Sequence, residues 1–416
     1  MFSIDASSMQ GRDLDTMFSF SGAEQRTLLK MAASLKKRLR PSLSAPYLPL
    51  TGRTMSMIFQ KRSTRTRVSA EGGFNQLGGH AIFLGACYDI YRERIPLFSY
   101  CTGWIFSTRA YFLSLSVLPA LPSMLTGSED IQLGKNESLV DTARVLGRFN
   151  DIVLARVYAH ADIDELCREC DKPVINALSD THHPLQLLAD MQTLEEQLGA
   201  VEGRTIAWVG DGNNILLSFL SSAGALGYNV RYATPPGYEP DAAVLAKSQA
   251  LANAAGVTIV GTHDPLIAVR GADAIVTDTW VSMGQEAEAS ARTKSFAGYQ
   301  VTEEMGRRGG AKPGWIFLHC LPRKPNEVDD DVFYGKRSVV WDEAENRKWT
   351  FQAVALVRSR GCAASERCDT TRIATDVPTP LLPPNSRLKS LAAWTTSGFY
   401  VVATFLPRRR YRRKSR

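Results

Sequence analysis

Hydroxyl and guanidinium side chains alternate in one short stretch near the start of the chain, Ser63-Thr-Arg-Thr-Arg67. The stretch follows the apolar residues Met55 to Phe59 and leads into a helix-like segment, so we expect a strand that runs into a helix. The first turn of a helix leaves backbone amides without internal partners, and hydroxyls beside them complete a phosphate site. Arg62, Arg65 and Arg67 supply cations around it, and a planar guanidinium can bind two phosphate oxygens. The alternative is an ordinary capped helix with solvated arginines.

Two further polar side chains stand at the start of a second expected helix. His183 and Gln186 lie three residues apart around Pro184, and proline commonly occupies the first helical position. This spacing places both side chains on one face at the helix N-terminus, where two donors can converge on one carbonyl oxygen. Arg156 follows the strand-like residues Asp151 to Ala155 and should face the ligand crevice of a sheet. A histidine beside such a proline is more often a cap than a catalyst, so the local pattern leaves both interpretations open.

A carboxylate and a thiol follow two later strand-like segments. Asp278 comes directly after Ala274 to Thr277, and Cys320 ends the apolar run that begins at Trp315. A carboxylate at this edge of a parallel sheet would balance the charge of an ammonium group, and a thiolate at Cys320 could contact the same amine. The alternatives are that Asp278 caps a following helix and that Cys320 is inert packing.

The segments between these groups alternate between strand-like and helix-like patterns, which predicts an α/β fold with doubly wound parallel sheets. The second half opens like a dinucleotide-binding unit at Gly210-Asp-Gly212. However, position 215 is Ile where that motif has a third glycine, and no acidic residue ends the next strand, Asn229 to Ala233. A dinucleotide site is therefore not expected.

Length and composition fit two globular domains. Of 416 residues, 44% are hydrophobic, which is enough for two buried cores. Seven arginines and lysines within the last nine residues account for the net charge of +7, so the rest of the chain is balanced. A folded basic face for nucleic acid is therefore not supported. Seven scattered cysteines, an odd number, indicate reduced thiols in an intracellular compartment.

Five further motifs follow the phosphate motif in a fixed order. They are His182-His-Pro-Leu-Gln186, Gly210-Asp-Gly-Asn-Asn214, Asp278-Thr-Trp-Val-Ser-Met-Gly284, His319-Cys-Leu-Pro-Arg323 and Glu345-Asn-Arg-Lys-Trp349. In this set and order the chain resembles the transcarbamylases, the aspartate/ornithine carbamoyltransferase family, and within them the ornithine type. The resemblance covers residues 11 to 85 and 129 to 355. Cys320 favours the ornithine type, because aspartate-type relatives have a proline at that place.

The resemblance implies two doubly wound domains, each with a central parallel sheet, joined by two interdomain helices. Residues 1–180 would form the carbamoyl-phosphate-binding domain, and residues 181–342 the ornithine-binding domain. A helix at 343–357 would pack back on the first domain. An insert at 85–127 and a tail at 358–416 depart from the family pattern, and we expect the tail to be disordered.

The resemblance also implies the site residues. Carbamoyl phosphate would contact Ser63, Thr64, Arg65, Thr66, Arg156, His183, Gln186, Cys320, Leu321, Arg347 and, from a neighbouring subunit, Gln132. L-Ornithine would contact Asn214, Asp278, Ser282 and Met283. The catalytic residues would be Arg156, His183 and Gln186 at the carbonyl oxygen, with Cys320 and Asp278 at the attacking amine.

The implied reaction transfers the carbamoyl group of carbamoyl phosphate to the side-chain amine of L-ornithine and yields L-citrulline and phosphate. It needs no metal and no organic cofactor. A homotrimer with shared active sites is implied as well, and neither nucleic acid nor membrane is expected as a partner. Animal relatives work in the mitochondrial matrix, but the first residues, Met1-Phe-Ser-Ile-Asp5, do not form a mitochondrial presequence, so a cytoplasmic location is the alternative.

Three other functions stay open at this point. An aspartate-type carbamoyltransferase is the nearest of them. A transcarbamylase-like protein without activity would result if the insert, which adjoins the loop of Gln132, obstructs the trimer. A membrane- or nucleic-acid-associated protein would depend on the basic end of the tail.

Overall fold

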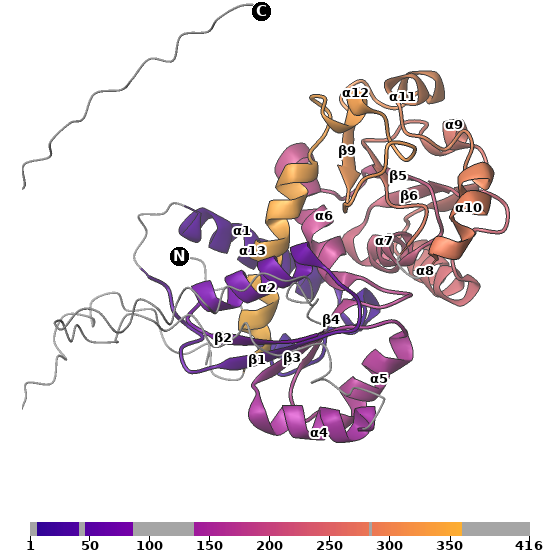
Figure 1. Cartoon of the computed structure of the whole chain (residues 1–416). Helices are drawn as coiled ribbons and strands as arrows, with labels where there is room; N and C mark the ends of the chain where they lie inside the picture. Colours follow the sequence, from indigo (N-terminus) through magenta and orange to yellow (C-terminus); the bar gives the residue numbers. More distant parts are fainter. Residues whose placement is uncertain (1–5, 41–45, 86–136, 283–284, 360–416) are drawn as a thin grey trace, which may run out of the picture. The chain divides into compact units, whose positions relative to one another are not determined.

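Each half of the chain builds its own parallel sheet (Figure 1). The computed structural model describes residues 6–40, 46–85, 137–282 and 285–359. The first sheet has the order β2-β1-β3-β4 and consists of β1 (Thr54–Phe59), β2 (His80–Gly85), β3 (Ile152–Arg156) and β4 (Val174–Leu178). The second has the order β7-β6-β5-β8-β9 and consists of β5 (Thr205–Val209), β6 (Asn229–Ala233), β7 (Ile259–Thr262), β8 (Ala274–Thr277) and β9 (Ile316–His319). The predicted α/β class with two parallel sheets is confirmed.

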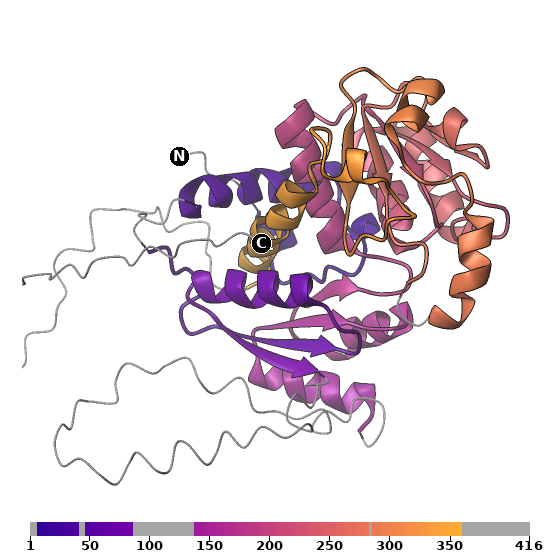
Figure 2. The ribbon, with the colours of Figure 1, turned by 45° about the horizontal axis from the view of Figure 1, so that its top comes forward.

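Helices cover both faces of the first sheet (Figure 2). α2 (Thr64–Gln76) lies on one face, and α4 (Leu139–Phe149) and α5 (His160–Glu169) lie on the other. In β1, Met57 packs into the apolar cluster on the α2 side, whereas its neighbour Ile58 packs into the cluster of α4 and α5. Successive side chains of a strand point to opposite faces, so a strand that is buried on both faces becomes an almost continuous apolar run.

The second sheet is built on the same principle. In β5, Ile206 and Trp208 join the apolar cluster that contains α7 (Asn214–Leu226), whereas Ala207 and Val209 join the cluster on the other face. The remaining helices of this half are α8 (Ala242–Ala254), α9 (Pro265–Ala268), η4 (Glu286–Glu288), α10 (Ala289–Ser295), α11 (Glu303–Gly309) and α12 (Asp330–Phe333).

Two long helices connect the sheets. α6 (Pro184–Leu198) follows the first sheet and contacts both β4 and α7, and α13 (Val340–Arg358) contacts β9 as well as α1 (Gly22–Leu39) and α2. α6 and α13 also pack against one another. These are the two interdomain helices that the family resemblance implies. Ahead of them, η1 (Ser7–Met9) and η2 (Met17–Ser19) precede α1, which begins with a capping box formed by Ser21 and Glu24.

Each sheet has one place where the strand order reverses. In the first sheet, the order reverses between β1 and β3. In the second sheet, it reverses between β5 and β8. Ligands of open parallel sheets bind outside the carboxyl ends of the strands at such a point. In the first sheet, the Ser63 motif follows β1 and Arg156 ends β3. In the second sheet, Asn213 follows β5 and Asp278 follows β8. The topology therefore selects the same residues that the motifs selected.

Some boundaries differ from the sequence-based expectations. α4 begins at Leu139, because the Ser138 hydroxyl accepts the backbone N–H of Asp141 and caps the helix there. The last helix begins at Val340 and ends at Arg358, which is fully buried rather than part of the tail. Residues 86–136 and 360–416 lie outside the described residues, so the insert and the disorder of the tail stay predictions. Within the described residues, no helix has the length and apolar character needed to cross a membrane.

Replacing Arg358 with Ala should lower the free energy of unfolding by about 2–4 kcal/mol. Its guanidinium group is buried, donates to the carbonyl of Met9 and lies 4.5 Å from the ring centre of Phe20, so the change removes a buried donor and leaves a cavity. Urea unfolding followed by circular dichroism measures the loss. Arg307→Ala, which breaks an exposed ion pair with Glu304, is the control and should change the free energy of unfolding far less, because water screens an exposed pair. Equal losses would contradict the anchoring role of Arg358.

Candidate active site

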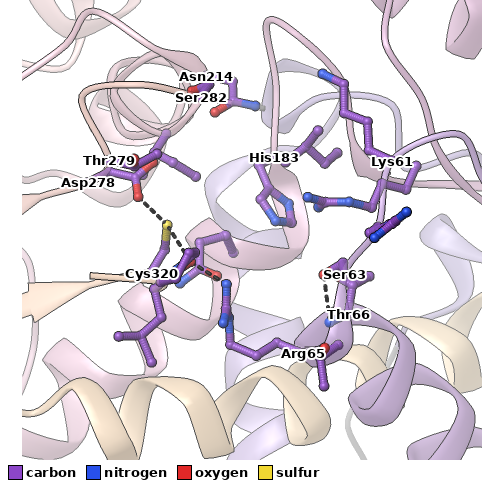
Figure 3. A pocket seen from close by; sticks show the side chains of 18 of the residues that line it. Lys61, Ser63, Arg65, Thr66, His183, Asn214, Asp278, Thr279, Ser282 and Cys320 are labelled. Atoms are coloured by element: carbon purple, nitrogen blue, oxygen red, sulfur yellow. Dashed lines mark hydrogen bonds between the residues drawn. The ribbon is translucent and has the colours of Figure 1, made fainter. Parts of the chain in front are cut away.

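The predicted site residues gather around one cavity of ≈ 560 Å³ (Figure 3). The residues that the family resemblance assigns to the two substrates all line this cavity where the structure describes them: Ser63, Thr64, Arg65, Thr66, Arg156, His183, Gln186, Asn214, Asp278, Ser282, Cys320, Leu321 and Arg347. Gln132 and Met283 lie outside the described residues, so their contacts stay predictions. Residues from both sheets therefore meet at one site, although the motifs are far apart in the sequence.

The cavity also has lining residues that the sequence analysis gave no site role: Lys61, Leu178, Ile215, Thr279, Val281, Pro322 and Lys324. Lys61 directly precedes Arg62, which the sequence analysis included among the cations, and this adjacency was the available signal. Burial and the nearby charge of Arg156 lower the pKa of Lys61. Lys61 adds a further cation to the end of the cavity that Arg65 and Arg156 line.

α2 presents its N-terminus to the cavity. Ser63 is its cap, with Oγ accepting the backbone N–H of Thr66 at 3.2 Å. Arg65 extends across the cavity and donates to the backbone carbonyl of Leu321, which follows β9 (Figure 3). The first turn of α2 and the turn after β9 are therefore in direct contact.

Arg67 does not join this cluster. Its Nε donates to Glu71 at 3.2 Å, and its guanidinium lies 3.8 Å from the ring centre of Phe83. Arg67 is not among the lining residues of the cavity. The prediction that Arg67 is one of the cations around the phosphate is wrong, because a helical turn of 3.6 residues carries it to another face than Arg65.

Arg156 and Arg347 are buried cations, 6% and 5% exposed. Burial, then the charges of Arg347 and Arg65, lowers the pKa of Arg156 to about 10. Burial also lowers the pKa of Arg347 to about 10, and Arg65 acts in the same direction. Both groups are still charged at neutral pH. Within the described part of the chain, no ion pair involves Arg65, Arg156 or Arg347.

His183 is a neutral donor. Nη1 of Arg347 donates to Nε2 of His183 at 3.2 Å, so the ring hydrogen is on Nδ1. Burial and the charges of Arg347, Arg156 and Arg65 hold the pKa of His183 well below its usual value. Its Nδ1 is buried and has no partner among the described atoms. This N–H can donate to a ligand, as the sequence analysis expected.

Gln186 does not act as a second donor in this arrangement. Its Nε2 donates to Asp190 Oδ1 and Glu343 Oε1, at 2.7 Å each, and its Oε1 accepts from Arg347. The expectation that Gln186 and His183 donate together to one oxygen overlooked these two carboxyl groups, which already hold the amide nitrogen. Gln186 instead contributes an oxygen that fixes Arg347.

Cys320 and Asp278 form the other end of the cavity (Figure 3). Sγ of Cys320 donates to Oδ1 of Asp278 at 2.8 Å. Burial, and then the charge of Asp278, raises the pKa of Cys320 well above the usual value of a thiol. The expected thiolate is therefore wrong, and the group is a neutral thiol. No helix starts at Asp278, so the alternative of a helix cap is also excluded.

The acceptor end has further support from asparagines. Asp278 Oδ2 accepts from Asn213 Nδ2 at 3.0 Å, and burial raises the pKa of Asp278. Asn214 lines the cavity and donates to the backbone carbonyl of Ser179 at 2.6 Å. Ser282 lines the cavity as well, and its backbone N–H donates to Gln285. Asn213 was not predicted as a site residue, although it directly precedes Asn214 in the Gly210–Asn214 motif.

A buried histidine–glutamate pair supports the turn that carries Cys320. Nδ1 of His319 accepts the backbone N–H of Leu321 at 2.9 Å, and its Nε2 donates to Glu327 at 3.1 Å. Leu321 has φ 60, in the left-handed region that costs a side-chain-bearing residue energy. The pair stabilises this conformation, which directs the Leu321 carbonyl toward Arg65. Nothing in the local sequence distinguishes Glu327 from surface carboxylates.

Asp278, His319 and Cys320 also offer ligand atoms within 4.8 Å of one another. Both ring nitrogens of His319 are already hydrogen bonded, and Cys320 bonds directly to Asp278. A metal ion would have to break these bonds. Among the described residues, the arrangement favours a hydrogen-bonded network over a metal centre.

Guanidinium groups at one end and a carboxylate at the other define a group-transfer site for an anionic donor and a cationic acceptor. Comparison with protein families agrees with this class. The carbamoyl-P binding domain of aspartate/ornithine carbamoyltransferase matches residues 12–93 and 110–196, and the Asp/Orn binding domain matches residues 202–357. The chain belongs to the aspartate/ornithine carbamoyltransferase family.

Individual relatives give the same family. A mitochondrial ornithine transcarbamylase of Gallus gallus is 46% identical over 349 residues, which cover 84% of this chain and 86% of the relative. An ornithine carbamoyltransferase of Carboxydothermus hydrogenoformans is 41% identical, with 83% and 97% covered. Among solved structures, ornithine carbamoyltransferase from Pyrococcus furiosus superimposes with a TM-score of 0.71 at 39% identity, covering 84% of this chain and 98% of that one.

Cys320 should react slowly with iodoacetamide in the folded protein, and its rate should still rise above pH 9, because the thiolate is the nucleophile and the pKa of the thiol is raised. Peptide mass spectrometry follows this cysteine separately from the others. Asp278→Asn removes the negative neighbour and should speed the reaction at a given pH. A rate at pH 7 equal to that of the unfolded chain, unchanged by Asp278→Asn, would contradict the assignment of a neutral thiol.

Proposed function

We propose that the chain is an ornithine carbamoyltransferase, which transfers the carbamoyl group of carbamoyl phosphate to the side-chain amine of L-ornithine and releases L-citrulline and phosphate. The observation that carries the proposal is one cavity with Arg65, Arg156 and Arg347 at one end and the pair of Asp278 and Cys320 at the other. The names of relatives at 41–46% identity support ornithine as the acceptor.

At the donor end, the phosphate would be bound by the residues of the Ser63 motif together with Arg156 and Arg347. Backbone amides at the start of α2 and the hydroxyls of Ser63 and Thr66 offer hydrogen bonds, and the arginines offer charge. Neutralising the phosphate makes it a better leaving group. The absence of ion pairs to these three arginines among the described residues supports an anionic ligand.

At the carbonyl group, Arg156 and the Nδ1–H of His183 would stabilise the negative charge that develops when the amine attacks. Nε of Arg156 and Nδ1 of His183 are both buried without a partner among the described atoms, which supports this role. Gln186 would act indirectly by holding Arg347 in place.

At the acceptor end, Asp278 would attract the ornithine ammonium group and receive a proton when the amine attacks. Its pKa is raised by burial, which suits a group that takes up a proton. Cys320, as a neutral thiol, would orient Asp278 by donating to it. Asn214, Ser282 and Met283 are proposed to bind the amino-acid end, and two reactants held side by side supply much of the rate.

We also propose a homotrimer in which Gln132 of one subunit reaches the phosphate of the next. Val68 in α2 and Ile82 in the edge strand β2 are 64% and 38% exposed, which supports an apolar subunit contact beside the donor end. The native mass tests this: three chains are expected, and a fully active monomer would contradict it. The mitochondrial matrix is the proposed compartment, supported by the Gallus gallus relative's name and testable by cell fractionation.

The acceptor assay tests the function directly. With carbamoyl phosphate present, L-ornithine should yield citrulline, whereas L-aspartate should yield no carbamoyl-aspartate, because Asp278 repels an acidic acceptor. Asp278→Asn should raise KM for ornithine by about tenfold or more, since it removes the counter-charge of the ammonium group. Chromatography of both products measures the choice. Carbamoyl-aspartate as the main product would establish the aspartate-type alternative, and neither product would indicate an inactive relative.

Arg65→Ala should lower kcat/KM for carbamoyl phosphate by about 100-fold or more, because it removes a charged donor aimed at the phosphate. Arg67→Ala is the matched control. Arg67 lies close to Arg65 in α2 but pairs with Glu71 outside the cavity, so its replacement should change kcat/KM by less than about threefold. Circular dichroism checks that both variants fold. Equal losses in the two variants would show that the phosphate site is placed incorrectly.

A further inference from the structure

Two carboxyl groups meet beneath the cavity, where α6 and α13 pack together. Asp190 of α6 and Glu343 of α13 are 1% and 2% exposed, and the side-chain amide nitrogen of Gln186 bridges them. Neither side chain lines the cavity. Gln186 Nε2 donates to Asp190 Oδ1 and to Glu343 Oε1, and Glu343 Oε2 accepts the backbone N–H of His319 at 2.9 Å. The pair thus contacts residues at both ends of the site.

Two buried carboxyl groups that accept from one amide nitrogen lie close enough to repel one another when both are ionised, so one of them keeps a proton. Both oxygens of Glu343 already accept N–H groups, and so does Oδ1 of Asp190. Oδ2 of Asp190 is buried and has no hydrogen-bond partner among the described residues. It is therefore the atom that can carry the hydrogen, and Glu343 is the ionised carboxylate of the pair.

We propose that Asp190 and Glu343 share one proton, carried by Asp190, and that this pair positions both ends of the transfer site. Through Gln186 it orients the amide so that the oxygen faces Arg347, and through the backbone of His319 it holds the turn of Cys320. Asp190 and Glu343 are positioning residues, because they act through these groups and do not reach the cavity. The proposal rests on the proposed function, since it assigns a role within that reaction.

The surroundings explain why the proton stays bound. Burial raises the pKa of Asp190 to about 7, whereas N–H donors to both oxygens of Glu343 favour the ionised form of that group. The charge of Arg347 favours the ionised form of Asp190, whereas the charge of Asp278 opposes it. The other titratable neighbours, Cys320, Tyr228 and His183, are neutral at pH 7 by the direction of their own shifts. Loss of the shared proton would leave two adjacent buried carboxylates, which repel one another.

Two conservative variants separate the roles of the pair. Asp190→Asn keeps an acceptor for Gln186 and supplies an N–H for Glu343, so it copies the protonated acid. Glu343→Gln turns one oxygen into an NH₂ group, which must face either the N–H of Gln186 or the N–H of His319. A buried donor left without an acceptor costs enough to lower kcat/KM for carbamoyl phosphate by about tenfold to hundredfold. We expect Asp190→Asn to lower it by less than about threefold.

Asp273→Asn is the control for loss of a buried carboxylate elsewhere, because Asp273 is 4% exposed, pairs with Arg204 and Lys312, and does not line the cavity. Its kcat/KM should stay near that of the wild type even if its stability falls. Equal kinetic losses in Asp190→Asn and Glu343→Gln, or full activity of Glu343→Gln, would overturn the proposal. If the wild type makes no citrulline, the proposed function fails instead.

Infrared spectroscopy tests the shared proton without any activity measurement. The wild type at pH 6 should show the carbonyl stretch of a protonated, buried carboxyl group, and this band should shift in D₂O, disappear in Asp190→Asn and fade as the pH rises through about 7. The stability of the wild type relative to Asp190→Asn should fall as the pH rises from about 4 to about 7, because the folded state keeps a proton there that the unfolded state has already released, and it should level off above that range. A wild type without the band, or a band that persists in Asp190→Asn, would contradict the proposal.

Discussion

Mutual repulsion among three guanidinium groups dominates this site. Arg65, Arg156 and Arg347 come from α2, β3 and α13, and each lines one cavity without an ion-pair partner in the described residues. Removing charge from water is costly unless an opposite charge compensates it. The fold keeps these cations together through buried hydrogen bonds, including those of Arg347 to Gln186, His183 and Thr66. In the proposed function, this charge supplies the binding energy for a phosphate.

The opposite end of the cavity carries the opposite charge. Asp278 lies there and accepts a hydrogen bond from Cys320. Glu327 accepts a hydrogen bond from His319, which directly precedes Cys320. In the proposed function, this separation would order the two substrates, because an anionic donor and a cationic acceptor are each attracted to one end only. α6 and α13 hold the two ends in register, since they pack against elements of both sheets and against one another. The parallel topology contributes by bringing the carboxyl ends of β1, β3, β5 and β8 to the two points where strand order reverses.

Sequence reasoning succeeded where the information is local. The strands are short apolar runs, and the cap of α2 is set by Ser63 and the residues directly after it. Motifs at strand ends were therefore enough to identify the cavity residues that we assign to the two substrates. It failed where the state of a group depends on distant neighbours: the protonation of Cys320 depends on Asp278, 42 residues away, and the orientation of Gln186 depends on Glu343, 157 residues away. Arg67 was misplaced because the cationic stretch was interpreted without the helical rotation that separates it from Arg65.

The most direct test of the central claim is calorimetric titration of the purified chain with inorganic phosphate, the simplest anion that resembles the leaving group. We predict one saturable site per chain, binding that weakens as salt concentration rises, and loss of that binding when Arg347 is replaced with Met, an uncharged side chain that cannot neutralise the anion. Phosphate binding that is absent in the wild type, or equally strong in Arg347→Met, would contradict the claim that uncompensated buried cations create the site.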